Sequence, residues 1–445
     1  MTQGIDYPDE GALEAATTRL RSLPPLVTSW EIEKLKQHLA DAQVGKRFVL
    51  QGGDCAETLS ECRPDIIAAK LKILLQMSLV LVHGSTKPVV RIGRFAGQYA
   101  KPRSQPMETR DGVSLPNYFG DLVNHAEFDA TSRAADPQLL LAGYHHAAMT
   151  INFIRSLSAG GFADLHHPEQ WDLSFFDSAG LPAELREEYQ RTSRQLSEAL
   201  RFMEALGETS IEELNRVEFY SSHEGLNLEY ESAQTRPVPR RDGHYCLTTH
   251  MPWIGERTRQ LDGAHVEFFR GIRNPIGVKI GPSMAPGEIL GLMGVLNPDD
   301  EPGKMVLITR MGVKAVERAL PPLLETVKRS GRRVLWICDP MHGNTQGTAS
   351  GRKTRDFGDI LREIELTMDA HAKVGTVFGG VHFELTGDDV TECIGGAEGL
   401  TEADLATNYA TACDPRLNYR QALEMAFLIA RRMRRTRPSA PPPEG

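Results

Sequence analysis

Short apolar runs rich in branched residues recur along the chain, and each ends in glycine or in polar residues. We expect eight of these runs to form strands: Phe48–Leu50, Val89–Ile92, Val217–Tyr220, Tyr245–Thr248, Ile276–Ile280, Val306–Ile308, Val334–Ile337 and Val377–Phe383. Most are separated by stretches with the period of a helix, such as Ile66–Val82, Pro286–Leu296, Val313–Arg329 and Thr354–Ala372. Strands joined in this way predict an α/β fold, a closed (β/α)8 TIM barrel. An open doubly wound sheet is the structural alternative, but no G-x-G-x-x-G follows the first run.

Three segments depart from this regular pattern. Residues 1–46 predict an N-terminal arm, with a helix that starts after Thr28 and reaches about Ala42, because Thr28 and Glu31 have capping-box spacing. The connection around 105–216 is longer than a barrel needs, so we expect extra helices inserted between strands 2 and 3. Its apolar residues recur at helical spacing and are Leu185, Tyr189, Leu196, Leu200 and Met203. This insertion would form either a packing or dimer surface or a regulatory site.

The predicted domains are therefore an arm (1–46), a catalytic barrel (47–433) and a proline-rich tail (434–445) that we expect to be disordered. The chain has 40% hydrophobic and 24% charged residues, which is ordinary for a soluble globular protein. No secretory signal is visible, and the longest apolar run, Leu71–Val82, is too short and too polar to span a bilayer. The six cysteines form no C-x-x-C pair, so we expect free thiols. These features predict a cytoplasmic protein without a membrane partner.

Cations are concentrated between Gly255 and Pro282 although the chain has a formal net charge of -9. They are Arg257, Arg259, Arg270, Arg273 and Lys279. Such a cluster in an acidic protein favours a small anionic ligand over nucleic acid, which would need a broad basic face. A solvated charged surface is the simpler interpretation. It is weakened by Lys279, which falls inside the apolar run Ile276–Ile280, since a buried lysine needs a partner.

Polar and reactive residues fall at or just after the carboxyl ends of the predicted strands. They are Cys55, Arg94, Glu224, Glu256, Arg257, Lys279, Arg310, His342 and Glu384. Barrel enzymes assemble their active sites on this face, so these loops should converge on one pocket.

Four of the residues near these ends form a candidate metal site: Cys55, His342, Glu384 and Asp414. A thiolate, an imidazole and two carboxylates suit a divalent transition metal, with Mn²⁺, Fe²⁺, Co²⁺ and Zn²⁺ all admissible. Taken singly, each has a plainer interpretation. Cys55 alone fits a core thiol, His342 a loop histidine, and Asp414 a helix cap.

Seven motifs occur together in this order: GGDCAE (52–57), RFAGQYAKPRS (94–104), the stretch 255–282, TRMG (309–312), DPMHGNT (339–345), HFELTG (382–387) and CDPRLN (413–418). The set resembles the type II, plant-like family of 3-deoxy-D-arabino-heptulosonate 7-phosphate (DAHP) synthases over about 29–431. Phe95 and Leu59 depart from the expected residues, but neither is a reacting group. The resemblance implies a metal-dependent transferase, 3-deoxy-7-phosphoheptulonate synthase. Such an enzyme condenses phosphoenolpyruvate with erythrose 4-phosphate, the first step of the shikimate pathway of aromatic amino acid biosynthesis.

The resemblance also assigns roles residue by residue. It implies the metal ligands Cys55, His342, Glu384 and Asp414, with Mn²⁺ the foremost candidate. The phosphoenolpyruvate clamp would be Arg94, Glu256 (through its backbone), Arg257, Lys279 and Arg310. Lys101, Arg103 and Ser104 would hold erythrose 4-phosphate. Lys279, Cys55, His342 and Glu256 are the candidate catalytic residues, and Lys279 is either a proton donor, with its pKa lowered by neighbouring arginines, or a purely electrostatic group.

Two alternatives and several partners stay open. Another metal-dependent aldolase acting on a 2-oxo acid would share the metal and the lysine but would release no phosphate. A catalytically inert barrel acting as a regulatory partner should lack a ligand or clamp residue, and none is missing. Family members imply a homo-oligomer, feedback inhibition by an aromatic amino acid and a chorismate mutase partner. If Asp414 is a ligand, Cys413 lies near Cys55, so oxidation could join the two thiols and expel the metal.

Overall fold

The computed structural model describes residues 3–159, 218–411 and 413–435, with isolated positions between 183 and 198. Its helices include α1 (Glu10–Ser22), α2 (Ser29–Gln43), α3 (Pro64–Ser85), α4 (Ala130–Arg133), α5 (Gln138–Ala159), α8 (Leu228–Ala233), α9 (Ala264–Arg270), α10 (Pro286–Leu296), α11 (Val316–Ser330), α12 (Phe357–Val374) and α13 (Tyr419–Arg435). The central strands are β1 (Phe48–Gly53), β2 (Val89–Arg94), β5 (Tyr220–Ser221), β8 (Trp253–Ile254), β9 (Ile276–Ile280), β10 (Met305–Thr309), β11 (Leu335–Cys338) and β14 (Gly380–Glu384). The short outer strands are β3 (Met107–Arg110), β4 (Val113–Pro116), β6 (Thr235–Pro237), β7 (His244–Cys246), β12 (Gln346–Gly347) and β13 (Lys353–Thr354).

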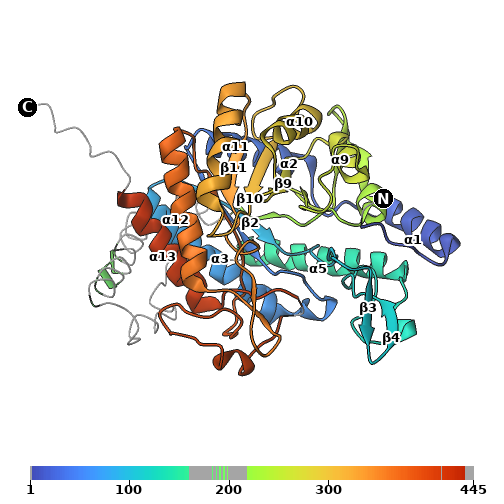
Figure 1. Cartoon of the computed structure of the whole chain (residues 1–445). Coiled ribbons are helices and arrows are strands. Elements are labelled where there is room, and N and C mark those ends of the chain that lie inside the picture. The colour runs from blue at the N-terminus through green and yellow to red at the C-terminus, as the bar shows by residue number, and fades with distance from the viewer. Residues whose placement is uncertain are drawn as a thin grey trace, which may run out of the picture.

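The central strands form one curled, wholly parallel eight-stranded sheet in the order β5-β2-β1-β14-β11-β10-β9-β8. An isolated parallel bridge between Glu224 and Trp253 joins the chain just after β5 to β8, the strand at the other end of this order. Helices α3, α10, α11, α12 and α13 lie around the strands (Figure 1). This arrangement is an α/β fold consistent with a (β/α)8 barrel.

The prediction of the fourth strand is wrong. Tyr245–Thr248 is expected in the central sheet, but His244–Cys246 forms β7, which pairs antiparallel with β6 outside that sheet. The central position belongs to Trp253–Ile254, which pairs with β9. A two-residue strand shows no alternation, whereas the His244–Cys246 region has the more typical composition of a strand. Val217, the first residue of the predicted third strand, lies outside the described residues.

The predicted helices are confirmed with small shifts at their ends. α10 has the predicted bounds, and α2 starts with the predicted capping box between Thr28 and Glu31. α2 packs Leu35, Leu39 and Ala42 into a cluster with side chains of β1, β2, β5, β8, β10 and β11, so this helix belongs to the core. The apolar residues expected to form helices between 185 and 203 lie outside the described residues, as do 436–445 of the predicted tail.

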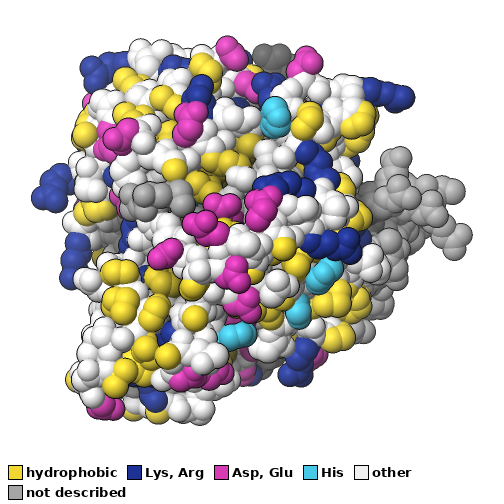
Figure 2. Space-filling model, turned by 90° about the vertical axis from the view of Figure 1, so that its right-hand side faces the viewer, with side chains coloured by type: hydrophobic (Ala, Val, Ile, Leu, Met, Phe, Trp, Pro, Cys, Tyr) yellow, Lys and Arg dark blue, Asp and Glu magenta, His cyan; other side chains and the backbone are white. Residues whose placement is uncertain are grey.

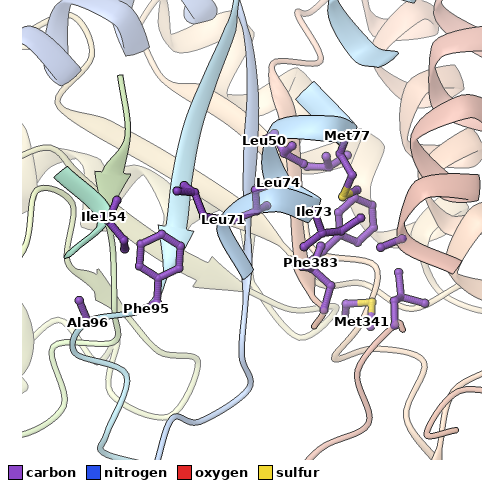
Figure 3. Close-up of a cluster of buried hydrophobic side chains, with 14 of the residues drawn as sticks. Leu50, Leu71, Ile73, Leu74, Met77, Phe95, Ala96, Ile154, Met341 and Phe383 are labelled. Atoms are coloured by element: carbon purple, nitrogen blue, oxygen red, sulfur yellow. The ribbon is translucent and has the colours of Figure 1, made fainter. Parts of the chain in front are cut away.

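α3 is the one described helix that is long and apolar enough to cross a membrane. Most of its residues are buried inside the protein, because it packs against α13, β1 and β2. Figure 3 shows Leu74 and Met77 of this helix beside Leu50 of β1 and Phe383 of β14. Burial of this kind accounts for its apolar composition without a bilayer.

The surface on the side that carries α1 and the β3–β4 hairpin mixes both signs of charge. Lysine, arginine, aspartate and glutamate are interspersed there with hydrophobic and neutral groups (Figure 2). That face therefore does not have the continuous positive potential that binds a polyanion.

Candidate active site

The register of three neighbouring strands brings the first group of polar residues together. Gly53 at the end of β1 is aligned with Arg94 on β2 and with Glu384 on β14. Cys55 follows two residues after Gly53, so its thiol reaches the same end of the sheet. On the other side of the sheet, Lys279 of β9 is aligned with Ile308 of β10, two residues before Arg310.

All twelve residues that the family resemblance assigns to the site line one cavity of about 280 Å³, whereas Arg259, Arg270 and Arg273 of the cation-rich stretch do not. They are Cys55, Arg94, Lys101, Arg103, Ser104, Glu256, Arg257, Lys279, Arg310, His342, Glu384 and Asp414. Glu224 lines it as well, together with residues that the sequence did not single out, including Gln98, Trp253, Thr345 and Lys353. The structure thus brings the anion-binding candidates and the metal-ligand candidates into one space.

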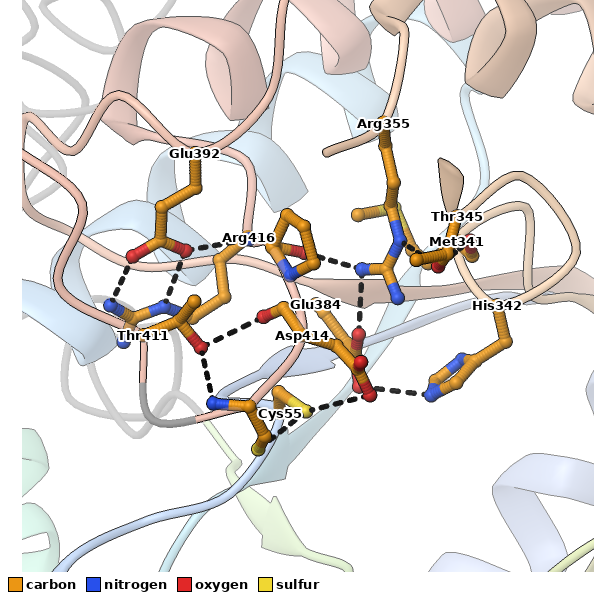
Figure 4. Close-up of polar contacts among 12 residues, drawn as sticks. Cys55, Met341, His342, Thr345, Arg355, Glu384, Glu392, Thr411, Asp414 and Arg416 are labelled. Carbon is orange, nitrogen blue, oxygen red and sulfur yellow. Dashed lines mark hydrogen bonds and ion pairs between the residues drawn. The ribbon is translucent and has the colours of Figure 1, made fainter. Parts of the chain in front are cut away.

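Three of the four candidate metal ligands lie close enough together to hold one cation, and the fourth, His342, lies beside one of the three. Atoms of Cys55, Glu384 and Asp414 lie within 4.8 Å of one another. His342 Nε2 lies 3.0 Å from Glu384 Oε1 (Figure 4). One soft sulfur, one imidazole nitrogen and carboxylate oxygens form a donor set typical of divalent transition metals.

Charged neighbours keep the two carboxylates of this set ionised. Burial opposes ionisation of Glu384, but His342, Arg355 and Arg94 hold its pKa well below the usual range. Burial likewise opposes ionisation of Asp414, and the Lys101 ammonium, 3.0 Å away, keeps its pKa low. Both side chains are therefore negative and able to coordinate a cation at neutral pH.

Lys101 stands beside two of the metal-ligand candidates. Its Nζ lies 3.0 Å from Cys55 Sγ as well as 3.0 Å from Asp414 Oδ2. Burial raises the pKa of the Cys55 thiol, and the Cys413 sulfur 3.1 Å away raises it further, whereas the Lys101 ammonium opposes both effects. Lys353 Nζ, on the β12–β13 hairpin, contacts the other Asp414 oxygen at 2.8 Å.

Asp339, which the sequence analysis did not single out, joins the two halves of the site. It is fully buried, forms an ion pair with Lys279 and accepts from His342 Nδ1 at 2.7 Å. The contact of Nδ1 with Asp339 orients the imidazole so that Nε2 faces Glu384 and the cavity. Its place three residues before His342 in the DPMHGNT motif was a signal that could have identified it.

Lys279 is buried and its pKa is lowered to about 8. Burial is the largest cause, Asp339 opposes it, and Arg94 contributes a further lowering. The expected direction is therefore observed, but desolvation rather than a crowd of arginines dominates. A lysine poised in this way can hold an anion or exchange a proton near neutral pH.

Neighbouring groups fix the buried Arg94 and the half-buried Arg310, and some of their donors stay unpaired among the described residues. Arg94 contacts His382 Nε2 at 2.6 Å and Glu384 Oε1 at 3.1 Å, and its guanidinium lies over Trp253. Arg310 donates to the His342 carbonyl at 3.3 Å, and its buried Nε has no hydrogen-bond partner in the described part of the protein. Unpaired buried donors of this kind fit an anionic ligand in the cavity.

Two further carboxylates border the cavity. Burial raises the pKa of Glu224, and its Oε1 has no hydrogen-bond partner among the described residues. Glu256 pairs with Arg259 at 3.0 Å through Oε1, and its buried Oε2 has no hydrogen-bond partner among the described residues, so the raised pKa is what sets Glu224 apart. Glu224 is thus the carboxylate better suited to exchange a proton with a ligand.

The segment with Lys101, Arg103 and Ser104 lines the cavity. Arg103 Nε donates to the Tyr118 carbonyl at 2.5 Å, and its backbone is held by Gln3 at 2.8 Å and 2.9 Å. Ser104 Oγ accepts from Arg257 at 3.0 Å. These contacts connect the segment to the stretch rich in cations.

The sequence model of the Class-II DAHP synthetase family matches residues 1–430. The chain belongs to this family. It is 50% identical over 448 aligned positions to a phospho-2-dehydro-3-deoxyheptonate aldolase of Neurospora crassa, covering 97% of this chain and 92% of that protein. Phospho-2-dehydro-3-deoxyheptonate aldolases from Streptomyces coelicolor and Mycolicibacterium smegmatis are 49% and 45% identical, each covering 96% of this chain and 94% and 91% of theirs.

Among solved structures, a phospho-2-dehydro-3-deoxyheptonate aldolase from Francisella tularensis aligns with a TM-score of 0.44 at 14% identity. The alignment covers 96% of this chain and 99% of that one. This likeness is too weak to support a conclusion about fold or function. The family model and the sequence relatives carry the family assignment.

Proposed function

We propose that this chain condenses phosphoenolpyruvate with erythrose 4-phosphate and releases phosphate, giving 3-deoxy-D-arabino-heptulosonate 7-phosphate at the entry of the shikimate pathway. One observation carries the proposal. A thiol, imidazole and carboxylate donor set shares a cavity with the buried Lys279 and Arg94 and with three further arginines. Membership of the Class-II DAHP synthetase family supports the same reaction.

The cationic residues bind phosphoenolpyruvate in this proposal. Arg94, Arg257, Lys279 and Arg310 neutralise its phosphate and carboxylate, and Glu256 contributes its backbone. Guanidinium groups suit the task because each offers two parallel donors and keeps its charge at all relevant pH values. The preorganised positions of Arg94 and Arg310 support these roles.

Cys55, His342, Glu384 and Asp414 hold a divalent metal, with Mn²⁺ the foremost candidate and Co²⁺, Fe²⁺ and Zn²⁺ admissible. A cation bound there would supply Lewis-acid polarisation of the aldehyde of the sugar phosphate. Lys101, Arg103 and Ser104 bind erythrose 4-phosphate near this position. The contact of Ser104 with Arg257 supports an arrangement in which the two substrates lie next to each other.

Proton transfer falls to Lys279 and Glu224. Lys279 donates a proton to a forming or departing oxygen, because a pKa of about 8 allows exchange near neutral pH. Glu224, whose pKa is raised by burial, accepts a proton from the water that adds to the carbon bearing the phosphate. Cys55 and His342 act by holding the cation, and Asp339 keeps Lys279 and His342 in position.

The proposal extends to the architecture and partners. The sheet closes as a (β/α)8 barrel (47–433), with an N-terminal extension (1–46), helices inserted between strands 2 and 3 (around 105–216) and a tail (434–445). The protein is a cytoplasmic homo-oligomer with neither membrane nor nucleic acid as partner. An aromatic amino acid inhibits it, and a chorismate mutase is its protein partner.

The test is phosphoenolpyruvate consumption with phosphate release in the presence of erythrose 4-phosphate and Mn²⁺, with and without a chelator. We expect turnover that stops when either the metal or the sugar phosphate is omitted. Consumption without phosphate release would replace the proposal by a different 2-oxo-acid aldolase. Folded, reduced protein that is inactive with Mn²⁺, Co²⁺, Fe²⁺ and Zn²⁺ would indicate a regulatory barrel instead.

A further inference from the structure

A carboxylate outside the cavity is completely buried beneath two of its loops. Glu363 lies in the middle of α12, and its side chain has no exposed surface. Its Oε1 accepts from the backbone N–H groups of Met311 and Gly312, each at 2.9 Å. Its Oε2 accepts from Asn344 Nδ2 at 2.7 Å. Every one of these contacts supplies a hydrogen to the carboxylate, so the two oxygens join two separate loops.

Asn344 completes the link between these loops. Its Oδ1 accepts from the Val313 N–H at 2.9 Å, and its Nδ2 also donates to the Pro340 carbonyl at 2.8 Å. Met311 directly follows Arg310 in the loop after β10, and Asn344 follows His342 by two residues in the loop after β11. The bridge therefore ties the arginine of the anion clamp to the histidine of the metal-ligand set.

The two loops also touch along their backbones. A Cβ built on Gly343 would lie 2.3 Å from the Gly312 nitrogen, and Gly312 has a φ of +79°. Only glycine allows this approach. Arg310 Nη2 reaches the His342 carbonyl at 3.3 Å across the same junction. Because no space remains between the two loops, neither loop can shift without displacing the other.

We propose that Glu363 is a positioning residue that fixes the Arg310 guanidinium relative to the His342 imidazole, so that one buried carboxylate sets both the affinity for the metal and the binding of phosphoenolpyruvate. This inference rests on the roles proposed above for Arg310 and His342. Glu363 touches neither substrate nor metal and acts only through the two loops. Glu363 does not contact the segment after β2 that binds erythrose 4-phosphate in the proposed function, so binding of that substrate at saturating metal should change least.

The test uses Glu363→Gln with Glu424→Gln as the matched control. Glu424, on α13, is also buried, and its Oε2 accepts a backbone N–H, that of Ala397, at 2.8 Å, away from the cavity. Burial raises the pKa of both carboxyls, and for Glu363 the donors on Gly312, Asn344 and Met311 oppose this effect and favour the ionised form. The amide introduced by Glu363→Gln would direct its hydrogens at Asn344 Nδ2 or at the two backbone N–H groups, so one side of the bridge is lost.

Three quantities are measured for each variant: Mn²⁺ affinity by calorimetric titration of the metal-free protein, and KM for each substrate by phosphate release at saturating Mn²⁺. For Glu363→Gln we expect Mn²⁺ affinity and KM for phosphoenolpyruvate to worsen about 10-fold to 100-fold, as for other residues that orient metal ligands. KM for erythrose 4-phosphate should change less than about twofold, within measurement error. Glu424→Gln should leave all three quantities at the wild-type values.

Asn344→Ala is a second test of the inference. It removes the Asn344 link between the two loops and leaves Glu363 its contacts with the Met311 and Gly312 N–H groups. It should reproduce the metal and phosphoenolpyruvate defects even if Glu363→Gln does not fold. Wild-type Mn²⁺ affinity and KM for phosphoenolpyruvate in either folded variant would overturn the inference. Two further variants distinguish failure of this inference from failure of the proposed function. Unchanged metal binding in His342→Ala, or unchanged phosphoenolpyruvate binding in Arg310→Ala, would refute the site assignment itself.

Discussion

Replacing Asp339 by Asn removes the negative charge that supports the buried Lys279 ammonium. Asp339 is fully buried, and its pKa lies well below the usual value; burial opposes this, but His342 and Lys279 outweigh it. It also forms the ion pair with Lys279 and accepts from His342 Nδ1 at 2.7 Å. Asn keeps the size of the side chain, so the expected effect is electrostatic.

The magnitude follows from the charge pair. Unit charges about 4 Å apart at an effective dielectric constant of about 20 interact by about 4 kcal/mol. One pKa unit corresponds to about 1.4 kcal/mol, so losing about 4 kcal/mol lowers a pKa by about three units. The pKa of Lys279 should therefore fall from about 8 to about 5. At about pH 7.5 the charged fraction of the lysine then falls from about three quarters to below about 1%, so kcat/KM for phosphoenolpyruvate should fall on the order of 100-fold.

The assay is phosphate release between about pH 5.5 and 9 at saturating metal. Saturating metal is needed because loss of the Asp339 contact to His342 should also weaken metal affinity. In the wild type, kcat/KM should decline as pH rises through about 8, where the lowered pKa of Lys279 lets the ammonium lose its proton. In Asp339→Asn the decline of kcat/KM should move to acidic pH. The control is Asp65→Asn, which changes an exposed aspartate and should leave the decline at the wild-type pH. A basic limb at the same pH in Asp339→Asn and wild type would refute the reasoning.

Three further predictions concern Lys279, the Cys55–Cys413 pair and Gly343. Lys279→Met should abolish turnover while leaving Mn²⁺ affinity within a few-fold, and an active variant would remove Lys279 from the chemistry. Peroxide should join Cys55 and Cys413, whose sulfurs lie 3.1 Å apart, with loss of bound metal and activity; reductant should restore both, and metal retained through oxidation would contradict this. Gly343→Ala should cost about 1–3 kcal/mol of unfolding free energy in urea, because its Cβ would meet the Gly312 nitrogen. Unchanged stability of this variant would mean that the loops can separate.

Local signals predicted the helices well and one strand badly. Proline at the start of α10 and the Thr28 capping side chain act within a single turn, so the sequence carries them directly. The fourth strand of the central sheet, Trp253–Ile254, depends on pairing with β9, a contact that no local pattern encodes. His244–Cys246 has the stronger local preference for a strand but pairs with β6, so tertiary contacts decided between the two segments.

The cavity residues could be predicted because parallel strands deliver the residues at their carboxyl ends to one face. Residues that support the cavity from outside this face follow no such rule. Arg355, for example, is fully buried and contacts Glu384 Oε2 at 2.7 Å, yet it comes from the end of the β12–β13 hairpin. Its importance depends on how that hairpin folds back over β14.

Glu363 lies between these two cases, since the helix period does contain a signal for it. In α12 the buried stripe includes Ile360, Ile364 and Thr367, and Glu363 falls on it, three residues after Ile360 and four before Thr367. Glu365, two residues on, lies off that stripe and pairs with Arg362 near the surface. A carboxylate on the apolar face of a helix must find hydrogen-bond donors, because burial without them costs several kcal/mol. The period therefore predicts that Glu363 has buried partners, while only the fold reveals that those partners are the loops carrying Arg310 and His342.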